Sequence, residues 1–593
     1  MRSLLISKGL LSSHIGRHIP LWVAFAAAWL VFLVLPLAIL APNAAHLSYP
    51  NEEMFYVGWS MEYIGSLIGT AIAGIASAVC VFDYAFNREA ALFNGSLPIK
   101  RTSLFATSYL AGFLPLLVVE LAVFAIVSLM ALAIPSIGLK YCLAWLALTV
   151  GFTFVFYSVA AFCAMLAGTK TAAYYLYLLV LFFVPLLELV LRGIAGSCMW
   201  GVELLAEVPV ALWVSPLLGM GYYTLAPCAE ITSTMQIGWG ALLIYVGVAV
   251  ALLALAVVFN KRRNLESAGN PVVFKGLGIV SRIATGIALA SLIAIITIFC
   301  LAFASAELGE VLTINQRVLL AVTTFLGGFL GVFFGEGLVG GSAGIFKRCW
   351  KLGLSVGIVC VLFIAGCSAD VLGVKRYVPQ TSEVKSVTVI VNGVSTTLKS
   401  EDNIEAVAQK HEEILGFEDL ANTGYGDTIG ITYKLKSGKV VERSYTLYLY
   451  DGDATFAVPD NVDRIKAANK VYTGLCKICD GDEGVMNRFS LLLDEDAWPI
   501  NIGLSYGDEQ DGSVSLTSKK QMRDFIQNAV MKDVKEHGLG MAYEVSSGHY
   551  VGNLYAGTQV GDSYRSVDID LFEGNCPNVA KWIKSNLGVD ILK

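Results

Sequence analysis

The sequence predicts a membrane-spanning all-α helical bundle followed by an extracytoplasmic α+β domain. Of the 593 residues, 56% are hydrophobic and only 15% are charged, which does not suit a water-soluble globule. Near residue 371 the long apolar runs give way to a mixture of charged, aromatic and turn residues. We therefore expect a multi-span membrane region that carries a folded domain at its carboxyl end.

Nine stretches are long and apolar enough to cross a membrane. A hydrocarbon core about 30 Å thick requires roughly 20 mostly apolar residues per helix. The stretches that satisfy this requirement are 21–41, 61–82, 113–134, 141–167, 172–191, 237–259, 283–303, 318–334 and 352–371. The first apolar run is too long for the core of a secretory signal, so we expect a retained anchor.

Basic residues between the spans predict the topology. With a cytoplasmic amino terminus, 15 Lys and Arg lie in cytoplasmic segments, and only Lys140, Arg192 and Arg317 lie outside. Nine spans then place the carboxyl-terminal domain outside. From residue 371 onward that domain has 23 Lys and Arg against 32 Asp and Glu, so nucleic acid is not an expected partner.

In the carboxyl-terminal domain, segments in which apolar and polar residues alternate are followed by segments with helical periodicity, which predicts an α+β fold. Two hairpins are expected, at Asn392 and Gly393 and at Ser437 and Gly438, because these residues suit short turns. Ser400 is expected to cap a helix that has one apolar face. Later helices are expected near 462–471, 520–537 and 579–587. The order of these elements also fits two small units in tandem.

No motif for catalysis or metal binding stands out. The sequence has no Gly-x-x-x-x-Gly-Lys-Ser/Thr run, so we expect this chain to lack its own ATPase activity. His411-Glu412-Glu413 lacks the second histidine of a zinc-protease helix. We therefore expect no catalytic residue, no metal site and no cofactor bound by this chain. An intramembrane enzyme would need convergent polar residues that the spans do not offer.

Cys476 and Cys479 form a Cys-x-x-Cys pair in the domain expected outside the membrane, where a disulfide is chemically permitted. No second such pair follows, and the surrounding order of strands and helices differs from that of thioredoxin. Redox or metal chemistry is therefore the weakest alternative. A structural disulfide and unpaired thiols both fit the sequence, and we favour the disulfide.

Two acidic residues, Glu120 and Glu188, lie inside predicted spans. A carboxylate facing lipid is costly, so both are expected to face protein or a water-filled interior. For Glu120 we favour an interhelical hydrogen bond, and the alternative is a role in a transport pathway. Glu188 precedes Arg192 by four residues, which is the spacing of a helical ion pair.

Small residues recur every fourth position in two spans. Such stripes let another helix approach closely, and we expect tight packing along them. The stripes are Gly65, Gly69 and Ala73 in the second span and Gly327, Gly331 and Gly335 in the eighth.

The most specific stretch, 83–101, joins the second and third spans. It predicts an amphipathic interfacial helix through Leu92 and Phe93 with a stop at Gly95, followed by Leu97-Pro98-Ile99-Lys100-Arg101. This pattern resembles the permease subunits of type 2 ABC exporters, in which a short helix and a Leu-Pro-x-x-Arg element dock on the ATP-hydrolysing subunit. The resemblance covers mainly 83–112, and the spans from 21 to 259 fit a six-helix permease core.

The resemblance implies a transmembrane permease subunit of an ATP-driven exporter. It divides the chain into a permease-like core at 1–260, three additional helices at 261–371 and an extracytoplasmic domain at 372–593. The last two parts resemble those of extended bacterial permeases. The residues implied to contact or position the ATPase are Arg88, Glu89, Leu92, Phe93, Lys100 and Arg101.

The implied partners are an ABC ATPase subunit that binds ATP and Mg²⁺, a second permease subunit in a homodimer or heterodimer, and the lipid bilayer of the cell membrane. The alternative is a membrane-anchored extracellular ligand sensor or binding protein. A sensor would pass its signal to a cytoplasmic kinase, cyclase or DNA-binding domain. We expect no such domain in this chain, which makes this alternative weaker.

Overall fold

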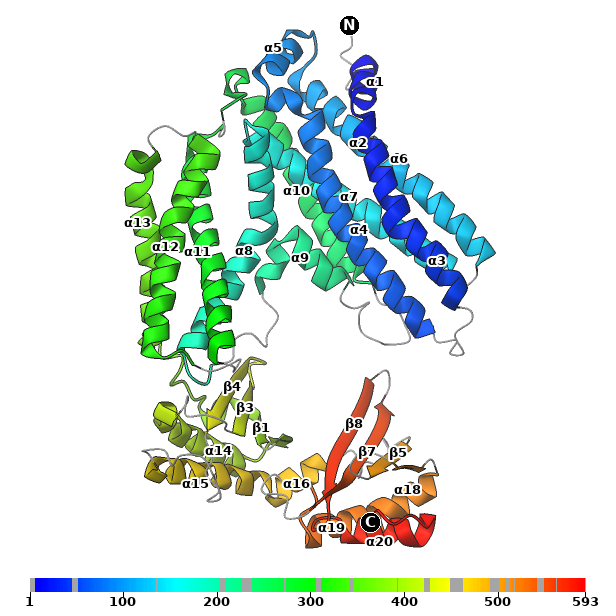
Figure 1. The fold of residues 1–593 in the computed structure, drawn as a ribbon, viewed down its shortest axis with the longest axis vertical. Helices are drawn as coiled ribbons and strands as arrows, with labels where there is room; N and C mark the ends of the chain where they lie inside the picture. The colour runs from blue at the N-terminus through cyan, green and yellow to red at the C-terminus, as the bar shows by residue number, and fades with distance from the viewer. Residues whose placement is uncertain are drawn as a thin grey trace. The chain divides into compact units, whose positions relative to one another are not determined.

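The computed structural model describes residues 6–44, 52–134, 137–202, 210–225, 237–270, 273–305, 311–340, 345–391, 393–420, 427–447, 462–490, 501–506, 512–516, 518–540, 549–560 and 563–591. It divides into two compact units (Figure 1). Unit 1 comprises Met1–Ile194, Glu207–Ala304 and Ile314–Ala365. Unit 2 comprises Ala195–Ala206, Ser305–Thr313 and Gly366–Lys593.

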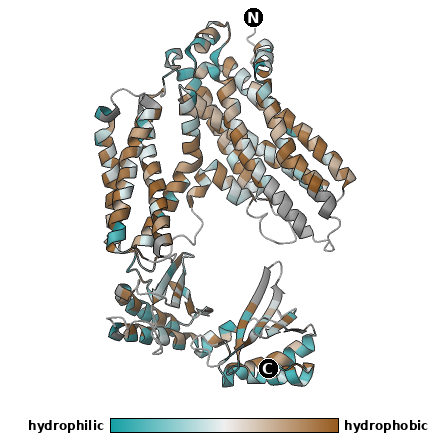
Figure 2. Ribbon diagram, in the orientation of Figure 1, coloured by the Kyte–Doolittle hydropathy of each residue, from teal (hydrophilic) through white to brown (hydrophobic). Residues whose placement is uncertain are grey.

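The part of the chain that the structure describes contains nine helical segments long and apolar enough to span a membrane, as predicted. Figure 2 shows hydrophobic residues along most of their length. The segments are Ile19–Ile39, Tyr63–Val81, Arg101–Ala133, Leu139–Leu166, Lys170–Cys198, Trp239–Arg262, Gly276–Phe303, Ile314–Leu338 and Lys347–Ser368.

Shorter helices connect these spans, and η denotes a 3-10 or π segment. The helices up to residue 368 are α1 (Lys8–Arg17), α2 (Ile19–Trp29), η1 (Leu30–Val34), α3 (Leu35–Ala44), α4 (Glu52–Val81), η2 (Asp83–Ala85), α5 (Arg88–Ser96), α6 (Arg101–Ala133), α7 (Leu139–Leu166), α8 (Lys170–Cys198), η4 (Val210–Val214), α9 (Pro216–Met220), η5 (Gly221–Leu225), α10 (Trp239–Arg262), η7 (Leu265–Ser267), α11 (Lys275–Ser305), α12 (Ile314–Gly340) and α13 (Ile345–Ser368).

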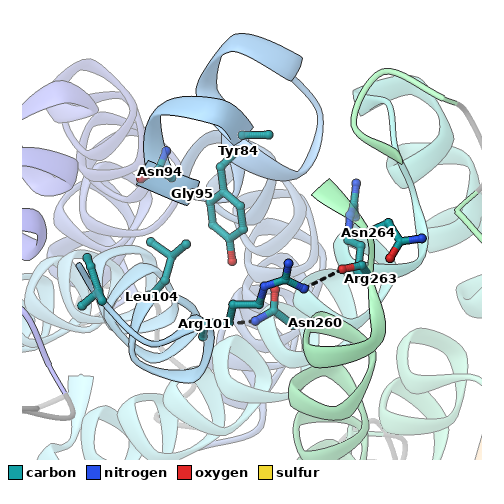
Figure 3. Close-up of a pocket in the computed structure, with 10 residues that line it drawn as sticks. Tyr84, Asn94, Gly95, Arg101, Leu104, Asn260, Arg263 and Asn264 are labelled. Carbon is teal, nitrogen blue, oxygen red and sulfur yellow. Dashed lines mark hydrogen bonds between the residues drawn. The ribbon is translucent and has the colours of Figure 1, made fainter. Parts of the chain in front are cut away.

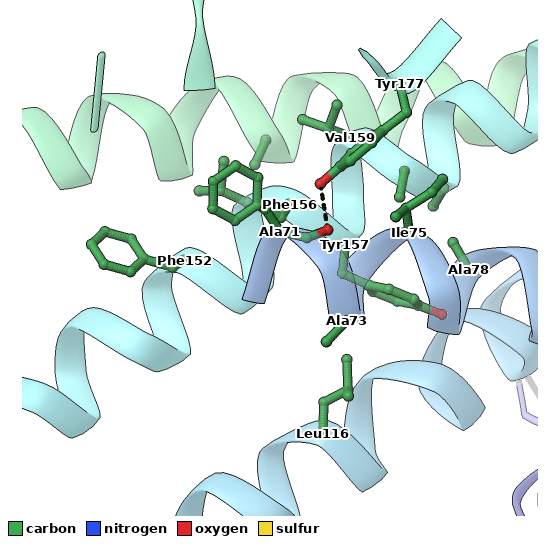
Figure 4. Packing of buried hydrophobic residues seen from close by; sticks show 14 of the residues in the cluster. Ala71, Ala73, Ile75, Ala78, Leu116, Phe152, Phe156, Tyr157, Val159 and Tyr177 are labelled. Carbon is green, nitrogen blue, oxygen red and sulfur yellow. Dashed lines mark hydrogen bonds between the residues drawn. The ribbon is translucent and has the colours of Figure 1, made fainter. Parts of the chain in front are cut away.

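Helix α7 is the centre of the core of unit 1, where α4, α6 and α10 pack against it. Its residues Trp145, Phe152 and Phe156 are completely buried, and Figure 4 shows part of this packing. At Gly74 of α4, an added Cβ would lie 3.1 Å from the Phe156 backbone, so the two helices approach closely there. Because α7 holds both α4 and α6, it fixes the two helices that the 83–101 segment joins.

The two stripes of small residues have different outcomes. The eighth-span stripe packs tightly as predicted, because an added Cβ at Gly331 would lie 2.9 Å from the Cα of Gly286 on α11. The prediction for Gly65 and Gly69 is wrong within the described chain, because an added Cβ at either position meets no atom within 4 Å. Helix α4 turns a different face to α7, and the close approach occurs at Gly74 instead.

Helices α11, α12 and α13 are joined by ion pairs that the sequence did not suggest. Glu336 on α12 is completely buried, pairs with Arg282 on α11, and lies 3.8 Å from the Arg348 guanidinium on α13. Tyr175 on α8 donates its hydroxyl to the Ser281 carbonyl at 2.8 Å, which connects α11 to α8. A buried carboxylate paired with arginine avoids the cost of an isolated charge.

Unit 2 contains two four-stranded antiparallel sheets with equivalent strand orders, β2-β1-β3-β4 and β6-β5-β7-β8. Each sheet is built from two hairpins with a helical segment between them, so the tandem arrangement considered from the sequence is confirmed. The strands are β1 (Val384–Val391), β2 (Val394–Leu398), β3 (Asp427–Leu435), β4 (Val440–Leu447), β5 (Asn501–Tyr506), β6 (Gly512–Leu516), β7 (Tyr550–Val560) and β8 (Ser563–Phe572).

The predicted helices of unit 2 are also present. They are η8 (Thr381–Glu383), α14 (Glu401–Ile414), η9 (Leu415–Leu420), α15 (Val462–Cys479), α16 (Asp482–Arg488), α18 (Lys519–Phe525), η10 (Ile526–Val530), α19 (Met531–Glu536) and α20 (Pro577–Leu587). The turn glycines Gly393 and Gly438 have φ values of +71° and +86°, which suit hairpin turns, whereas Asn392 lies outside the described residues.

Two side-chain predictions in unit 2 are corrected. Ser400 precedes α14 as expected but makes no capping bond, because its hydroxyl donates to Glu483 at 2.6 Å instead. Cys476 and Cys479, both within the described chain, are not joined by a disulfide. They face the core one turn apart on α15, where both are completely buried, and burial raises the pKa of the Cys479 thiol to about 11. They therefore act as small apolar side chains.

His411 on α14 is completely buried against the first sheet. Its ring nitrogens lie 3.1 Å from the Tyr433 hydroxyl and 2.7 Å from the Tyr445 hydroxyl. Burial first, and then the nearby Arg443 charge, lower the pKa of His411 from 6.5 to about 4. The folded domain therefore holds this histidine neutral at pH 7.

Acidification is expected to destabilise unit 2 through His411. Between pH 6.5 and 4 the unfolded chain binds a proton that the folded chain does not, so the free energy of unfolding decreases as pH falls, by up to about 3 kcal/mol at pH 4. Thermal unfolding of wild type and His411→Gln between pH 4 and 7 measures this, because glutamine does not titrate. Equal pH dependence in the two proteins would contradict the prediction.

Candidate functional site

The 83–101 segment forms the predicted short helix outside the spans, at the same end of unit 1 as α1 (Figure 1). Helix α5 begins after Asn87, whose side-chain oxygen accepts a hydrogen bond from the Glu89 amide at 3.0 Å. It ends at Ser96, one residue beyond the predicted glycine stop. Leu97 is extended because it precedes Pro98, which disfavours helical backbone at the preceding residue.

Helix α5 has one buried and one exposed face, and large apolar residues lie on the exposed one. Ala91 is 2% exposed and faces the protein, whereas Leu92 and Phe93 are 64% and 66% exposed. The charged residues Arg88, Glu89 and Lys100 of the same segment are also exposed. We call the group the α5 surface and define it as the exposed residues Arg88, Glu89, Leu92, Phe93 and Lys100.

Arg101, which the sequence grouped with these residues, joins two helix ends. Its guanidinium Nη1 donates to the Arg263 carbonyl at 2.8 Å. In return, the Asn260 side-chain amide donates to the Arg101 carbonyl at 3.1 Å. These bonds connect the start of α6 to the end of α10. Arg101 therefore holds the carboxyl end of the 83–101 segment against the end of α10.

Arg263 is the residue of this region that sequence reasoning missed, because it was counted only among the basic residues that set topology. Its buried guanidinium donates from Nη1 to the carbonyls of Ala164 and Ala167 at 3.2 and 2.7 Å, and from Nη2 to the carbonyl of Ala85. The unpaired carbonyls at a helix C-terminus favour a positive charge. Burial lowers the pKa of Arg263 to about 10, which leaves it charged at neutral pH.

The hydrogen bonds of Arg263 and Arg101 connect several helix ends close to α5. Arg263 connects the end of α7 to η2, and Arg101 connects α6 to α10. Asp83 of η2 also pairs with Lys170 at the start of α8, at 3.0 Å. These contacts therefore connect the ends of five spans close to α5, since η2 follows α4 directly.

The two intramembrane acidic residues lie away from this surface. Glu120 is completely buried and accepts a hydrogen bond from the Thr153 hydroxyl of α7, which confirms the predicted interhelical bond. Glu188 pairs with Arg192 at 2.6 Å, as predicted, and accepts a hydrogen bond from the Val210 amide at 3.1 Å. Glu188 is 18 residues along α8 from Lys170, roughly 27 Å at 1.5 Å per residue.

Removing the Thr153 hydroxyl is expected to destabilise the bundle by about 1 kcal/mol, the size of an interhelical hydrogen bond in a membrane. Thr153→Val keeps the shape of the side chain and leaves Glu120 without this donor. Thermal unfolding in detergent measures the loss. Thr149→Val is the matched control, because the buried Thr149 hydroxyl has no hydrogen-bond partner among the described residues. Equal unfolding temperatures for the two variants would refute the prediction.

Comparison of the chain with protein-family models, with curated proteins and with solved structures found no significant match. Within the described ranges, no group of three or more His, Cys, Asp or Glu residues is arranged to hold a metal ion.

Proposed function

We propose that the chain is the transmembrane permease subunit of a type 2 ABC exporter and that the α5 surface binds its ATPase subunit. The observation that carries this proposal is the exposure of Leu92 and Phe93, at 64% and 66%, on a short helix outside the spans. Adjacent exposed large apolar residues in a segment with exposed charged residues are typical of a protein-binding surface.

The connections beneath α5 support a coupling role. An ATPase dimer that closes on ATP would push α5, and the contacts of Arg263, Arg101 and Asp83 would pass this movement to α4, α6, α7, α8 and α10. A change of access in the bundle requires that several spans move together. Contacts between α5 and only one helix would not move several spans together.

In the proposed assembly, ATP and Mg²⁺ bind to the partner ATPase, and a second permease subunit completes the transport route in the lipid bilayer. The excess of Lys and Arg in the predicted inner segments supports a cytoplasmic amino terminus and α5 surface. Unit 2 would then lie outside the cell membrane. Its acidic composition is compatible with an exposed soluble domain.

Affinity purification of the full chain from native membranes in a mild detergent, followed by mass spectrometry, tests the proposal. We expect a P-loop ATPase to co-purify and to hydrolyse ATP in the complex. If other membrane complexes survive the extraction but no ATPase is found, the proposal fails. A co-purifying kinase or response regulator would instead favour the sensor alternative.

A further inference from the structure

A pocket of about 250 Å³ lies against α5, where Ala91, Asn94 and Gly95 line it (Figure 3). Helix α5, η2, the start of α6 and the end of α10 form its walls. Leu104 and Ile99 provide apolar surface. Its polar lining consists of Tyr84, Asn94, Arg101, Asn260, Arg263 and Asn264.

Tyr84 places an unpartnered hydroxyl in this pocket. The residue is only 7% exposed, and its hydroxyl makes no hydrogen bond within the part of the chain that the structure describes. Figure 3 shows the hydroxyl directed toward Arg101. A buried hydroxyl without a partner is costly, and a ligand that accepts its hydrogen bond would remove this cost.

Arg263 provides a positive charge at the pocket that is not paired with a carboxylate. Its guanidinium contacts carbonyl oxygens, and no carboxylate lies within ion-pair distance of it in the described structure. Asp83, the acidic residue of η2, pairs with Lys170 instead. The helix carbonyls balance part of this charge, and an anion in the pocket would add a further attractive interaction with it.

We infer that this pocket binds a phosphate group. Its donors are the Tyr84 hydroxyl and the N–H groups of the Arg101 guanidinium other than the one that donates to the Arg263 carbonyl, which approach from η2 and α6. Donors from two elements suit the oxygens of a phosphate, and arginine is well suited to binding this group. The headgroup of an inner-leaflet phospholipid and a soluble phosphate both present it. The inference does not depend on ATPase docking.

Inorganic phosphate is the first probe. We expect it to raise the thermal unfolding temperature of the purified full chain in a nonionic detergent, relative to chloride at equal ionic strength. Tyr84→Phe should weaken this response by about tenfold in phosphate concentration, the size of one hydrogen bond to a charged group. Without phosphate, Tyr84→Phe should unfold at the wild-type temperature or above, because the hydroxyl has no partner to lose.

Arg101→Gln and Arg262→Gln form a matched pair, because each removes one positive charge. Arg262 is exposed and does not line the pocket, so only Arg101→Gln should lose the phosphate response. This difference separates binding in the pocket from general attraction of an anion to a basic surface.

Nanodiscs distinguish the two sources of phosphate. Wild type and Tyr84→Phe are reconstituted with phosphatidylcholine alone or with added phosphatidylglycerol, and retained lipid is counted by native mass spectrometry. Retention of phospholipid by wild type above Tyr84→Phe identifies a headgroup site, and a response to inorganic phosphate alone identifies a soluble ligand. If wild type and Tyr84→Phe behave identically with both probes, the inference is overturned.

Discussion

Leu92→Ser combined with Phe93→Ser is expected to abolish co-purification of the proposed ATPase partner while the chain remains folded. Both side chains are already about two thirds exposed, so serine creates no cavity in the core. Loss of the two apolar contacts should weaken ATPase binding by about 3 kcal/mol, or about a hundredfold. Quantitative mass spectrometry of the purified complexes measures the ratio of the proposed ATPase to this chain.

Met486→Ser is the control for this double variant. Met486 is also an exposed large apolar residue, at 51%, but it lies on α16 of unit 2. This control should keep the wild-type ratio of the proposed ATPase to this chain. If the double variant retains the ATPase as well as Met486→Ser does, the α5 surface is not the docking site.

Arg263→Gln is expected to cause the largest loss of stability of any single substitution proposed for the chain. Glutamine cannot replace the donors that the guanidinium directs to Ala164, Ala167 and Ala85, so buried carbonyls are left unpaired. We expect a loss of about 2–4 kcal/mol, because each unsatisfied buried group costs about 1–3 kcal/mol. Thermal unfolding of the purified protein in detergent measures the loss.

Arg262→Gln removes the same charge at the exposed neighbouring position, so it controls for charge at the end of α10. It should unfold within about 0.5 kcal/mol of wild type, as surface substitutions usually do. Equal unfolding temperatures for Arg263→Gln and Arg262→Gln would show that the carbonyl contacts of Arg263 do not stabilise the fold.

The spans and the strands could be predicted because each depends on a local pattern. A run of roughly 20 apolar residues has few alternatives to a membrane helix, and all nine predicted stretches are helical in the structure. The hairpins followed from alternation around Gly393 and Gly438. The α5 helix was also predictable, since Asn87 and Pro98 mark its two ends.

The hydrogen bonds that connect the helix ends close to α5 could not be predicted, because they join residues far apart in the chain. Lys261, Arg262 and Arg263 are adjacent basic residues after a span, and nothing local distinguishes the third. Only the end of α7, about 100 positions earlier in the sequence, makes Arg263 a buried donor to helix carbonyls. Glu336 was missed for a similar reason, since it follows the predicted end of the eighth span and meets Arg282 on another helix.

Two local patterns led to wrong predictions because the fold gives the side chains an environment that differs from the one the pattern suggests. Ser400 has the residue type and position of a helix cap, but the Glu483 carboxylate provides a charged acceptor for its hydroxyl. Cys476 and Cys479 have the spacing of a reactive pair, but α15 turns both toward the hydrophobic core. Neither competing environment can be identified from the neighbouring residues alone.

Photo-crosslinking from α5 in native membranes tests most directly whether this surface binds an ATPase. A photoreactive benzoylphenylalanine is placed at position 93 and, as a control, at position 486, and crosslinked proteins are identified by mass spectrometry. We predict a crosslink from position 93, and not from position 486, to a protein that contains a P-loop. A position 93 probe that crosslinks only to lipid, or to proteins without a P-loop, would contradict the proposed function.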